Sequence, residues 1–303
     1  MGVPFRMVFY APDEAAATRA ADAAFGRIED LNAIMSDYAT DSEVSYLSRS
    51  SEEGAPEVRV SEDLWHVLWA AQKLAVETDG AFDATIGPCA ALWRKARREK
   101  ELPDAAPQAR ALAKVGYQSL RLDPKTRSAR LVQYGMRLDL GGIAKGYAAD
   151  EALKVLRGLG IHSALVAASG DLALGDAPPG TRGWRVEIAG YDAPGGPPSH
   201  VVLLENRGVA TSGDLFQRLE IGGVRYSHIL NPFTCVGMTN HALATVVAKD
   251  CMTADMLATA CTILPKEEAL ELAADYGVAM RVVTMEKETP VPSENRRFRN
   301  LVD

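Results

Sequence analysis

The sequence predicts an α+β fold in which antiparallel sheets pack against helices. Short strand-like runs come in groups, and helical runs interrupt these groups irregularly instead of alternating with single strands. A Gly222-Gly223 turn between two alternating runs also indicates an antiparallel hairpin. The composition, with 47% hydrophobic and 24% charged residues, is that of an ordinary globular chain. Because 303 residues suffice for one large core or two moderate ones, we expect a single unit of two closely packed lobes over residues 1–303, with no separate linker domain.

The first part of the chain predicts a strand and two long helices. The strand is expected over Phe5–Tyr10, where apolar and polar residues alternate. A helix follows, because Pro12-Asp13-Glu14 places proline and acids in a first turn, and its apolar face extends to Met35. A second helix begins near Ser61 and ends at the Asp79-Gly80 turn. We interpret these elements as scaffold.

The middle of the chain predicts short strands, one helix and one buried strand. Short strands are expected over residues 117–140, with the LDPKT turn between two of them. A helix over residues 143–159 ends at Gly160. The mostly apolar run HSALVAASGDLALG, residues 162–175, then predicts a single buried strand.

The last part of the chain predicts more strands and two helices. Loops rich in glycine and proline, residues 175–183 and 192–198, flank the expected strand WRVEIAG. Further strands are expected at VVLLE, GVATS, RLEIGGVRYSHIL, ALATVVAKD and GVAMRVVTM. One helix is expected over residues 253–264, closed by Pro265, and another from Lys266.

Charge argues against a nucleic-acid partner. The net charge of −7 disfavours a wide surface for nucleic acid or anionic lipid, since such a surface needs clustered cations. The basic run over residues 93–101 is the exception, and its mixed signs favour a solvated helix face or an exposed loop. No apolar run approaches the roughly 20 residues of a membrane span. The compartment stays open: the periplasm or cell envelope is expected if a leader was removed, and the cytoplasm otherwise.

The four cysteines do not form a metal or redox motif. They are widely spaced, without a C-x-x-C pair. We therefore expect all four to be buried thiols: Cys89, Cys235, Cys251 and Cys261.

The run LDLGGIAKGYAAD, residues 138–150, is a candidate phosphate site. Gly141 and Gly142 at a strand-to-helix junction let backbone approach a ligand, and the free N–H groups of a first helical turn attract phosphate. Lys145 adds a cation. A paired glycine before a helix is structural as often as it binds phosphate, so both interpretations stay open.

The run DCMTADMLATA, residues 250–260, is a candidate metal site. Asp255 and Thr259 are four residues apart on a helix, so a carboxylate and a hydroxyl project from one face as oxygen ligands suited to Mg²⁺. On spacing alone, an exposed acid and a threonine bonded to its own helix is the simpler interpretation.

Two further runs carry polar groups. His228 in RYSHILNP ends a strand, where a histidine can act as a general base or bind phosphate, although a lone histidine is usually a packing or surface residue. The run GVATSGD places Thr211, Ser212, Gly213 and Asp214 in a polar turn after a strand.

Together these runs resemble a known family. Eight blocks occur in the order found in the FAD:protein FMN transferases, the ApbE family, between residues 35 and 260: MSDY, DSEVS, TDGAFDATIGP, LDLGGIAKGYAAD, SGD, ATSGD, YSHILNP and MTADMLATA. The resemblance implies a duplicated T-fold-like α+β architecture with FAD in a cleft between lobes. It also implies a Mg²⁺-dependent enzyme that cleaves FAD, releases AMP and transfers FMN to a threonine or serine hydroxyl of an acceptor protein.

The resemblance also implies roles for individual residues. Asp255, Thr259 and the backbone carbonyl of Ala144 are the expected metal ligands, and His228 and Lys145 the expected catalytic residues. The expected FAD-binding residues are Met35, Tyr38, Ser42, Asp83, Gly141, Gly142, Lys145, Thr211, Ser212, Gly213, Asp214 and His228, with the Tyr38 ring beside the flavin.

The chain departs from the family pattern at three places. Cys235 ends Pro232-Phe233-Thr234-Cys235 where relatives commonly read Pro-x-Thr-Gly, so a turn that prefers glycine is altered. Ser48 replaces a common asparagine, and Ala167-Ala168-Ser169 replaces Asn-Ala-Gly. An FAD pyrophosphatase that yields FMN and AMP, or a non-catalytic FAD-binding protein, therefore stays an alternative.

Overall fold

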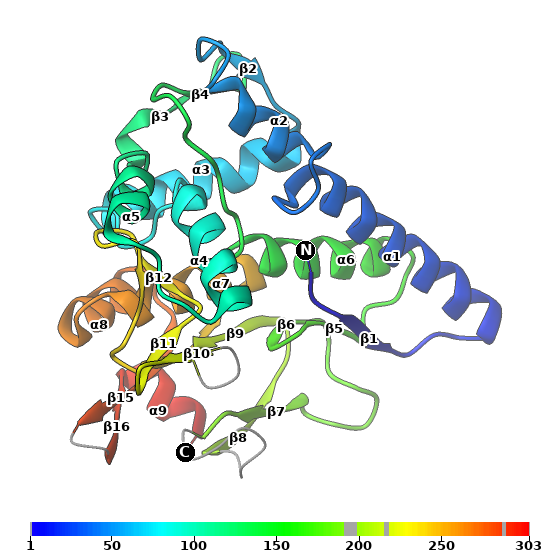
Figure 1. The fold of residues 1–303 in the computed structure, drawn as a ribbon. Helices are drawn as coiled ribbons and strands as arrows, with labels where there is room; N and C mark the ends of the chain where they lie inside the picture. Colours follow the sequence, from blue (N-terminus) through cyan, green and yellow to red (C-terminus); the bar gives the residue numbers. More distant parts are fainter. Residues whose placement is uncertain (1, 191–198, 215–217, 287–288, 303) are drawn as a thin grey trace. The chain divides into compact units, whose positions relative to one another are not determined.

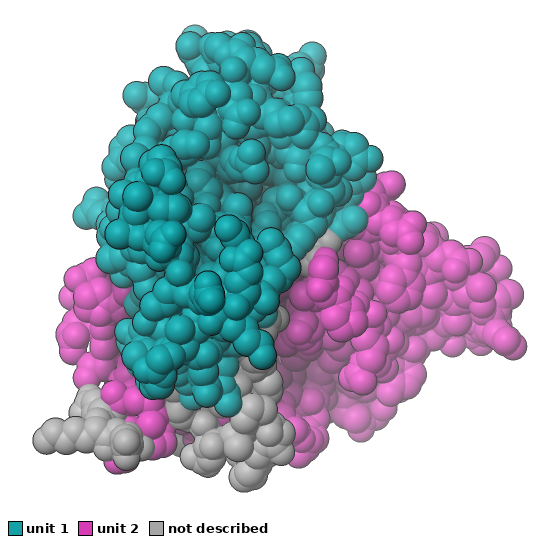
Figure 2. Space-filling view, in the orientation of Figure 1, with its two compact units in different colours: residues 1, 31–142, 216–241 teal, residues 2–30, 143–215, 242–303 magenta. Residues whose placement is uncertain are grey.

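The computed structural model describes residues 2–190, 199–214, 218–286 and 289–302. It confirms the predicted α+β class, with helices and antiparallel sheets (Figure 1). Unit 1 comprises residues 1, 31–142 and 216–241, and unit 2 comprises residues 2–30, 143–215 and 242–303 (Figure 2). The close packing of two lobes into one unit, with a ligand cleft between them, stays a prediction.

Unit 2 is built on a seven-stranded sheet in which every neighbouring pair is antiparallel. Its strands, in spatial order, are β1 (Phe5–Phe9), β5 (Ala164–Ala168), β6 (Asp171–Leu174), β9 (Arg207–Gly213), β14 (Leu243–Ala248), β15 (Ala279–Glu286) and β16 (Thr289–Glu294). The central strand β14 is buried at all six positions, so both faces of the sheet are covered there.

Two helices contact one face of this sheet: α6 (Ala144–Gly158) and α7 (Cys251–Ile263). A Cβ atom on Gly208 of β9 would lie 2.1 Å from the backbone carbon of Asp250, which caps α7, so this residue faces the helix. The next residue, Val209, points to the opposite face of the sheet and belongs to a hydrophobic cluster that contains Phe298. Three further elements contribute to that cluster: β7 (Trp184–Ile188), β8 (His200–Leu204) and α9 (Arg296–Val302).

Unit 1 combines short sheets with helices. Its three-stranded sheet has the order β2 (Val58–Arg59), β4 (Ser128–Leu131) and β3 (Leu120–Asp123). Its helices are α2 (Glu43–Ser50), α3 (Glu62–Glu77), α4 (Gly87–Glu99), α5 (Ala105–Leu112) and the 3₁₀ turn Tyr117–Ser119. Two hairpins pair β10 (Arg218–Ile221) with β11 (Val224–Ser227), and β12 (Leu230–Asn231) with β13 (Val236–Gly237). One cluster joins α4, α5 and the hairpins around Trp93.

Many predicted elements are confirmed. Helix α1 (Glu14–Met35) crosses from unit 2 into unit 1 along the chain, and α3 begins at Ser61, whose hydroxyl accepts from Leu64 N. The Gly222-Gly223 turn joins β10 to β11, and α6, α7 and α8 (Lys266–Asp275) match their predicted positions. The predicted loop at 192–198 lies outside the described residues.

Three predictions are wrong. Residues 162–175 form two antiparallel strands, because Ser169, with φ +59°, turns the chain between Ala168 and Asp171. Strands do not extend over residues 132–140. The basic run, by contrast, lies on α4 with Lys95, Arg97 and Arg98 exposed, which agrees with the predicted solvated helix face. The third wrong prediction is that all four cysteines are thiols: Cys89 and Cys235 form a disulfide, and Cys251 and Cys261 are buried free thiols.

In the described part of the chain, no helix combines the length and apolar character that a membrane crossing requires.

Candidate functional site

A buried cluster of one lysine and two aspartates lies at the start of α6 in unit 2. The Lys145 ammonium donates to both carboxylate oxygens of Asp255, at 2.8 and 3.0 Å, and lies 3.0 Å from Oδ2 of Asp171. The backbone N–H of Gly146 donates to Asp255 Oδ2 at 3.1 Å. Asp255 is fully buried and Asp171 is only 3% exposed. The cluster therefore joins α6, α7 and the first residue of β6.

A glycine permits this cluster. A Cβ atom on Gly146 would lie 2.4 Å from the carbonyl oxygen of Cys251, the first residue of α7. Any side chain at this position would push the two helices apart. Since Lys145 and Asp255 lie on these two helices, the close crossing at Gly146 brings the ammonium within hydrogen-bonding distance of the carboxylate.

Neighbouring charges in the cluster shift the pKa values of Lys145 and Asp171. Burial alone would lower the pKa of Lys145, but the negative charges of Asp255 and Asp171 outweigh burial, so its pKa is raised and the ammonium stays charged. Burial and the nearby Asp255 raise the pKa of Asp171 to about 7, although Lys145 opposes the shift. One ammonium thus faces two carboxylates, and the charge balance of these three residues favours a further cation.

One oxygen of the cluster keeps a lone pair available. Asp171 Oδ2 is close enough to Lys145 for charge attraction, yet among the described residues it has no partner with hydrogen-bond geometry. The charge of Lys145 compensates part of the solvation that this buried oxygen loses, but not the missing hydrogen bond. It is an observation that fits a cationic ligand beside Asp171.

Hydroxyl groups extend the site along β9. Ser212 Oγ lies 3.2 Å from Thr259 Oγ1, and Thr211 Oγ1 lies 2.9 Å from the hydroxyl of Thr245 on β14. Thr259 follows Asp255 by one turn of α7, so the two predicted metal ligands share a helix face. Gly213 is needed for a close strand contact, because its Cβ would lie 2.6 Å from Ala242 O.

The remaining predicted residues of unit 2 border this cluster in the chain. Ala144 is the first residue of α6 and precedes Lys145, while Asp214 follows Gly213 and is 1% exposed. Within the described residues, no group of three His, Cys, Asp or Glu side chains is placed to hold a metal ion. A metal at this site would therefore depend on hydroxyl and carbonyl oxygens in addition to carboxylates.

Unit 1 contains a second charged network, centred on Arg94 of α4. The guanidinium of Arg94 contacts Asp37 and lies 2.8 Å from Asp139 Oδ2, while Asp139 Oδ1 accepts from the backbone N–H of Gly141 at 2.8 Å. The guanidinium carbon also lies 4.1 Å from the centre of the Tyr38 ring. Because that ring is still 67% exposed, its opposite face is open.

Arg94 compensates two carboxylates that burial and mutual repulsion disfavour. Burial, followed by the charge of Asp139, raises the pKa of Asp37, and Arg94 partly opposes this shift. Burial disfavours the charge on Arg94, but the two aspartates raise its pKa overall. The network therefore fixes Tyr38 and the Gly141 turn relative to α4.

Three predicted FAD-binding residues have structural contacts of their own. Met35 is buried at the end of α1. Ser42 caps α2, since its hydroxyl accepts from Ser45 N and donates to Ser36 O. The Asp83 carboxylate accepts from the backbone N–H groups of Thr85 and Tyr117, so it fastens two loop segments together, and burial raises its pKa. Gly142 ends unit 1 beside Gly141.

His228 lies in the two-residue connection between β11 and β12. Backbone hydrogen bonds flank it on both sides, from Ser227 N to Met238 O at 2.8 Å and from Met238 N to Ile229 O at 2.9 Å. Its own side chain is exposed. The ladder thus fixes the backbone of His228 and leaves its imidazole at the surface of unit 1.

Four residues of these networks were assigned no role from the sequence: Asp37, Arg94, Asp139 and Asp171. Asp171 is the last residue of the SGD block that was quoted for the resemblance, so a signal existed but no role was assigned to it. Arg94 belongs to the run interpreted as a solvated face or loop, and nothing in the local sequence reveals that it contacts two distant aspartates.

Comparisons with known proteins agree on one family. A model described as the ApbE family matches residues 1–282. A Haemophilus influenzae protein named FAD:protein FMN transferase is 30% identical over 282 residues, which are 91% of this chain and 81% of that protein. The solved structure of the flavin transferase ApbE from Vibrio cholerae has a TM-score of 0.88 and 26% identity, with 99% of this chain and 96% of that chain covered.

A second solved structure gives the same result. The apo form of the Pseudomonas stutzeri flavinyl transferase ApbE has a TM-score of 0.84 and 28% identity, and the match covers 98% of this chain and 93% of that chain. The family match includes every block that was quoted from the sequence. This chain belongs to the ApbE family.

Proposed function

We propose that this chain is a Mg²⁺-dependent FAD:protein FMN transferase. It cleaves the pyrophosphate of FAD, transfers FMN to a threonine or serine hydroxyl of an acceptor protein and releases AMP. The observation that carries the proposal is the buried cluster of Lys145, Asp171 and Asp255, which combines an ammonium suited to phosphate with carboxylates suited to a divalent cation. The names of the relatives support the same activity.

The donor set fits magnesium. Asp255 and Thr259 would hold the ion together with the carbonyl of Ala144, all hard oxygen ligands of the kind Mg²⁺ prefers. The excess of carboxylate over ammonium charge, and the buried Asp171 oxygen without a hydrogen bond, support a cation at this position. Since Lys145 donates to both Asp255 oxygens, binding of the ion requires Lys145 to give up at least part of this contact.

This exchange suggests a role for Lys145 toward FAD. An ammonium displaced from Asp255 is a strong donor for a phosphate oxygen, because its own raised pKa keeps it charged. In the Gly141-Gly142 turn the N–H of Gly141 already donates to Asp139 Oδ1, so the turn would offer the N–H of Gly142 to the phosphates. Thr211, Ser212, Gly213 and Asp214 would line the dinucleotide. Tyr38 provides its open ring face to the flavin, as an aromatic residue held from behind by Arg94.

The chemistry then divides among these residues. A divalent cation held by Asp255, Thr259 and the carbonyl of Ala144 would neutralise charge that develops on the transferring phosphoryl group. His228, exposed on its hairpin, accepts the proton of the acceptor hydroxyl. The resulting oxygen nucleophile attacks the FMN phosphorus, the bond to the bridging oxygen breaks, and AMP leaves.

The test uses the purified chain with FAD, MgCl₂ and an acceptor domain that carries a threonine. We expect a covalently flavinylated acceptor, seen as an in-gel fluorescent band and a mass increase, together with AMP in equal amount. FMN and AMP without a labelled acceptor would identify a pyrophosphatase instead. FAD retention without AMP, even at high magnesium, would contradict both enzymatic activities and identify a flavin-binding protein.

A further inference from the structure

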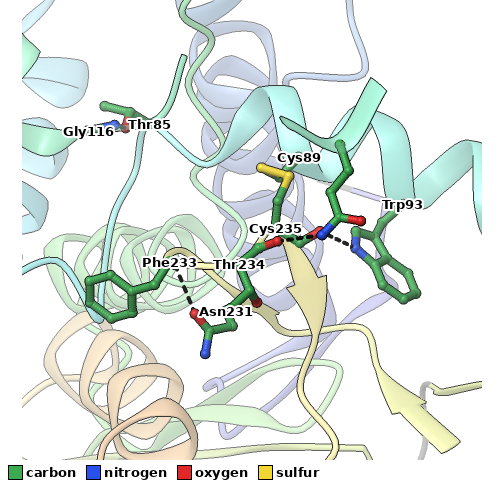
Figure 3. Close-up of a disulfide and its surroundings, with 9 residues drawn as sticks. Thr85, Cys89, Trp93, Gly116, Asn231, Phe233, Thr234 and Cys235 are labelled. Carbon is green, nitrogen blue, oxygen red and sulfur yellow. Dashed lines mark hydrogen bonds between the residues drawn. A yellow bond between two sulfur atoms is a disulfide. The ribbon is translucent and has the colours of Figure 1, made fainter. Parts of the chain in front are cut away.

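The disulfide between Cys89 and Cys235 joins helix α4 to the turn between β12 and β13. We call this β12–β13 pair, together with the preceding residues His228 and Ile229, the His228 hairpin. Both cysteines belong to unit 1, and the bond links positions 146 residues apart in the sequence (Figure 3). Cys89 lies in the first turns of α4, and Cys235 ends the turn between β12 and β13. Both are fully buried, so the bond is part of the core.

A second residue of the same helix face holds the same turn. Trp93, one helical turn after Cys89, donates its indole N–H to Cys235 O at 2.8 Å (Figure 3). Its ring also contacts Tyr226 of β11, with 5.5 Å between ring centres. Helix α4 thus contacts β11, which precedes His228, and the turn that follows β12.

The backbone at Cys235 is in a conformation that needs support. Its φ angle is +60°, in the left-handed region that residues other than glycine adopt only when their surroundings hold them there. The turn contributes its own bonds, because Cys235 N and Thr234 N both donate to Asn231 O. The disulfide adds the one covalent restraint on this conformation within the described residues.

The restraint reaches His228 through a short ladder. Leu230 pairs with Gly237 and Asn231 with Val236, so the turn and the histidine are the two ends of one hairpin. The hydrogen bonds of Met238 with Ser227 and Ile229 then close the ladder around His228. Movement of the turn away from α4 would therefore displace the backbone of residues 228–229, and with it the imidazole of His228.

We propose that the Cys89–Cys235 disulfide is a positioning element for transfer: it fixes the His228 hairpin on α4, and its reduction slows the proton-transfer step without weakening FAD binding. This inference rests on the role proposed for His228. The two cysteines touch no reacting atom and act through the histidine.

The test compares oxidised and reduced enzyme. Dithiothreitol breaks the S–S bond, supplies two electrons and two protons to form two thiols, and itself becomes a cyclic disulfide. Iodoacetamide labelling and mass spectrometry give the fraction reduced, and far-UV circular dichroism confirms that the reduced protein is folded. We expect kcat for AMP release to fall at least about tenfold while KM for FAD changes less than about twofold, because a misplaced base affects chemistry and not ground-state binding.

Two variants separate positioning from general stability. Cys89→Ala with Cys235→Ala removes the bond and leaves a left-handed residue unsupported, so kcat should be low and indifferent to dithiothreitol. Cys89→Ala with Cys235→Gly also removes the bond but supplies a residue that adopts φ +60° freely, so part of kcat should return. Equal kcat in oxidised and reduced wild type would overturn the proposal, as would a fall in kcat that the glycine variant shares fully with the alanine variant.

A measurement without activity distinguishes this proposal from the proposed function. Hydrogen exchange of the backbone amides at 224–238 should speed up on reduction, with the amides of α6 unchanged as an internal reference. Unchanged exchange in the hairpin overturns the positioning role, whether or not the chain is active. Faster exchange in a protein that never releases AMP would sustain the mechanical link and contradict the transferase function.

Discussion

The ammonium of Lys145 lies 2.8 Å from one oxygen of the Asp255 carboxylate and 3.0 Å from the other. The two residues are 110 positions apart, and they meet because α6 and α7 cross closely at Gly146. Under the proposed function, a cation that binds Asp255 would release Lys145 for a phosphate, so cation binding and phosphate binding would be coupled. Four predictions follow from this arrangement and from the networks around it.

Replacing Asp255 by asparagine should abolish magnesium-dependent turnover. The amide keeps nearly the same shape and can still accept from Gly146 N, but it has no charge to offer a divalent ion. Removing a residue that only hydrogen-bonds to a metal ligand typically lowers metal affinity or activity by about 10–100-fold. For loss of a ligand itself we expect the rate of AMP release to fall at least about 100-fold. The wild-type rate in the variant at any magnesium concentration would show that the carboxylate is not a ligand.

Replacing Gly146 by alanine should destabilise unit 2. The added Cβ would lie 2.4 Å from Cys251 O, and a backbone atom cannot be moved without separating the helices. Overpacking of this kind costs about 1–3 kcal/mol, measured as the change in unfolding free energy in urea. Gly158 at the end of the same helix is the matched control, since nothing lies within 4 Å of its Cβ position. Similar stability of both variants would refute the close crossing.

Replacing Asp150 by asparagine should change how stability depends on pH. Asp150 accepts from the backbone N–H groups of Cys251 and Met252 at the start of α7, and burial raises its pKa from 3.8 to about 7. Between these two pH values the folded chain holds a proton that the unfolded chain has lost, so this group makes the unfolding free energy fall as pH rises. The asparagine variant lacks this contribution.

The measurement is the unfolding free energy of wild type and Asp150→Asn at several pH values. The difference, variant minus wild type, should rise from about pH 4 to about pH 7 and then level off. If the new amide NH₂ group faces Met252 N, the unfolding free energy that this contact costs is the same at all pH values. It shifts the whole curve of the difference against pH by a constant. A difference that is flat over this interval would contradict the raised pKa.

Replacing Arg94 by alanine should destabilise unit 1 through Asp37 and Asp139. The two carboxylates would be left partly buried without their shared cation, and such a loss costs about 1–3 kcal/mol. Arg98→Ala on the exposed face of the same helix should change stability by less than about 0.5 kcal/mol. Adding Asp37→Asn to Arg94→Ala should recover part of the loss, and the absence of any recovery would show that the arginine acts by packing alone.

The sequence predicted the elements that carry regular patterns. Ser61 marked the start of α3, the Gly222-Gly223 turn marked a hairpin, and the spacing of Asp255 and Thr259 placed both on one helix. These signals are local, because capping, turn formation and helical periodicity depend on neighbours in the chain.

Signals that depend on distant residues could not be predicted from one sequence. The Ser169-Gly170 pair is a local turn signal, but it does not reveal that Ser169 adopts φ +59° or that the segments on its two sides pair as strands. The pairing of Cys89 with Cys235 depends on where α4 and the β12–β13 turn meet, which spacing does not encode. The contact of Lys145 with Asp171 and Asp255 likewise requires the packed helices and sheet.

The most direct test of the account is a crystal of the chain grown with Mn²⁺ as a magnesium substitute and measured at the manganese absorption edge. We expect an anomalous peak at coordination distance from the Asp255 carboxylate and the Thr259 hydroxyl, with the Lys145 ammonium withdrawn from at least one Asp255 oxygen. A peak elsewhere, or an unchanged Lys145–Asp255 pair in crystals of enzyme that is active with manganese, would contradict it.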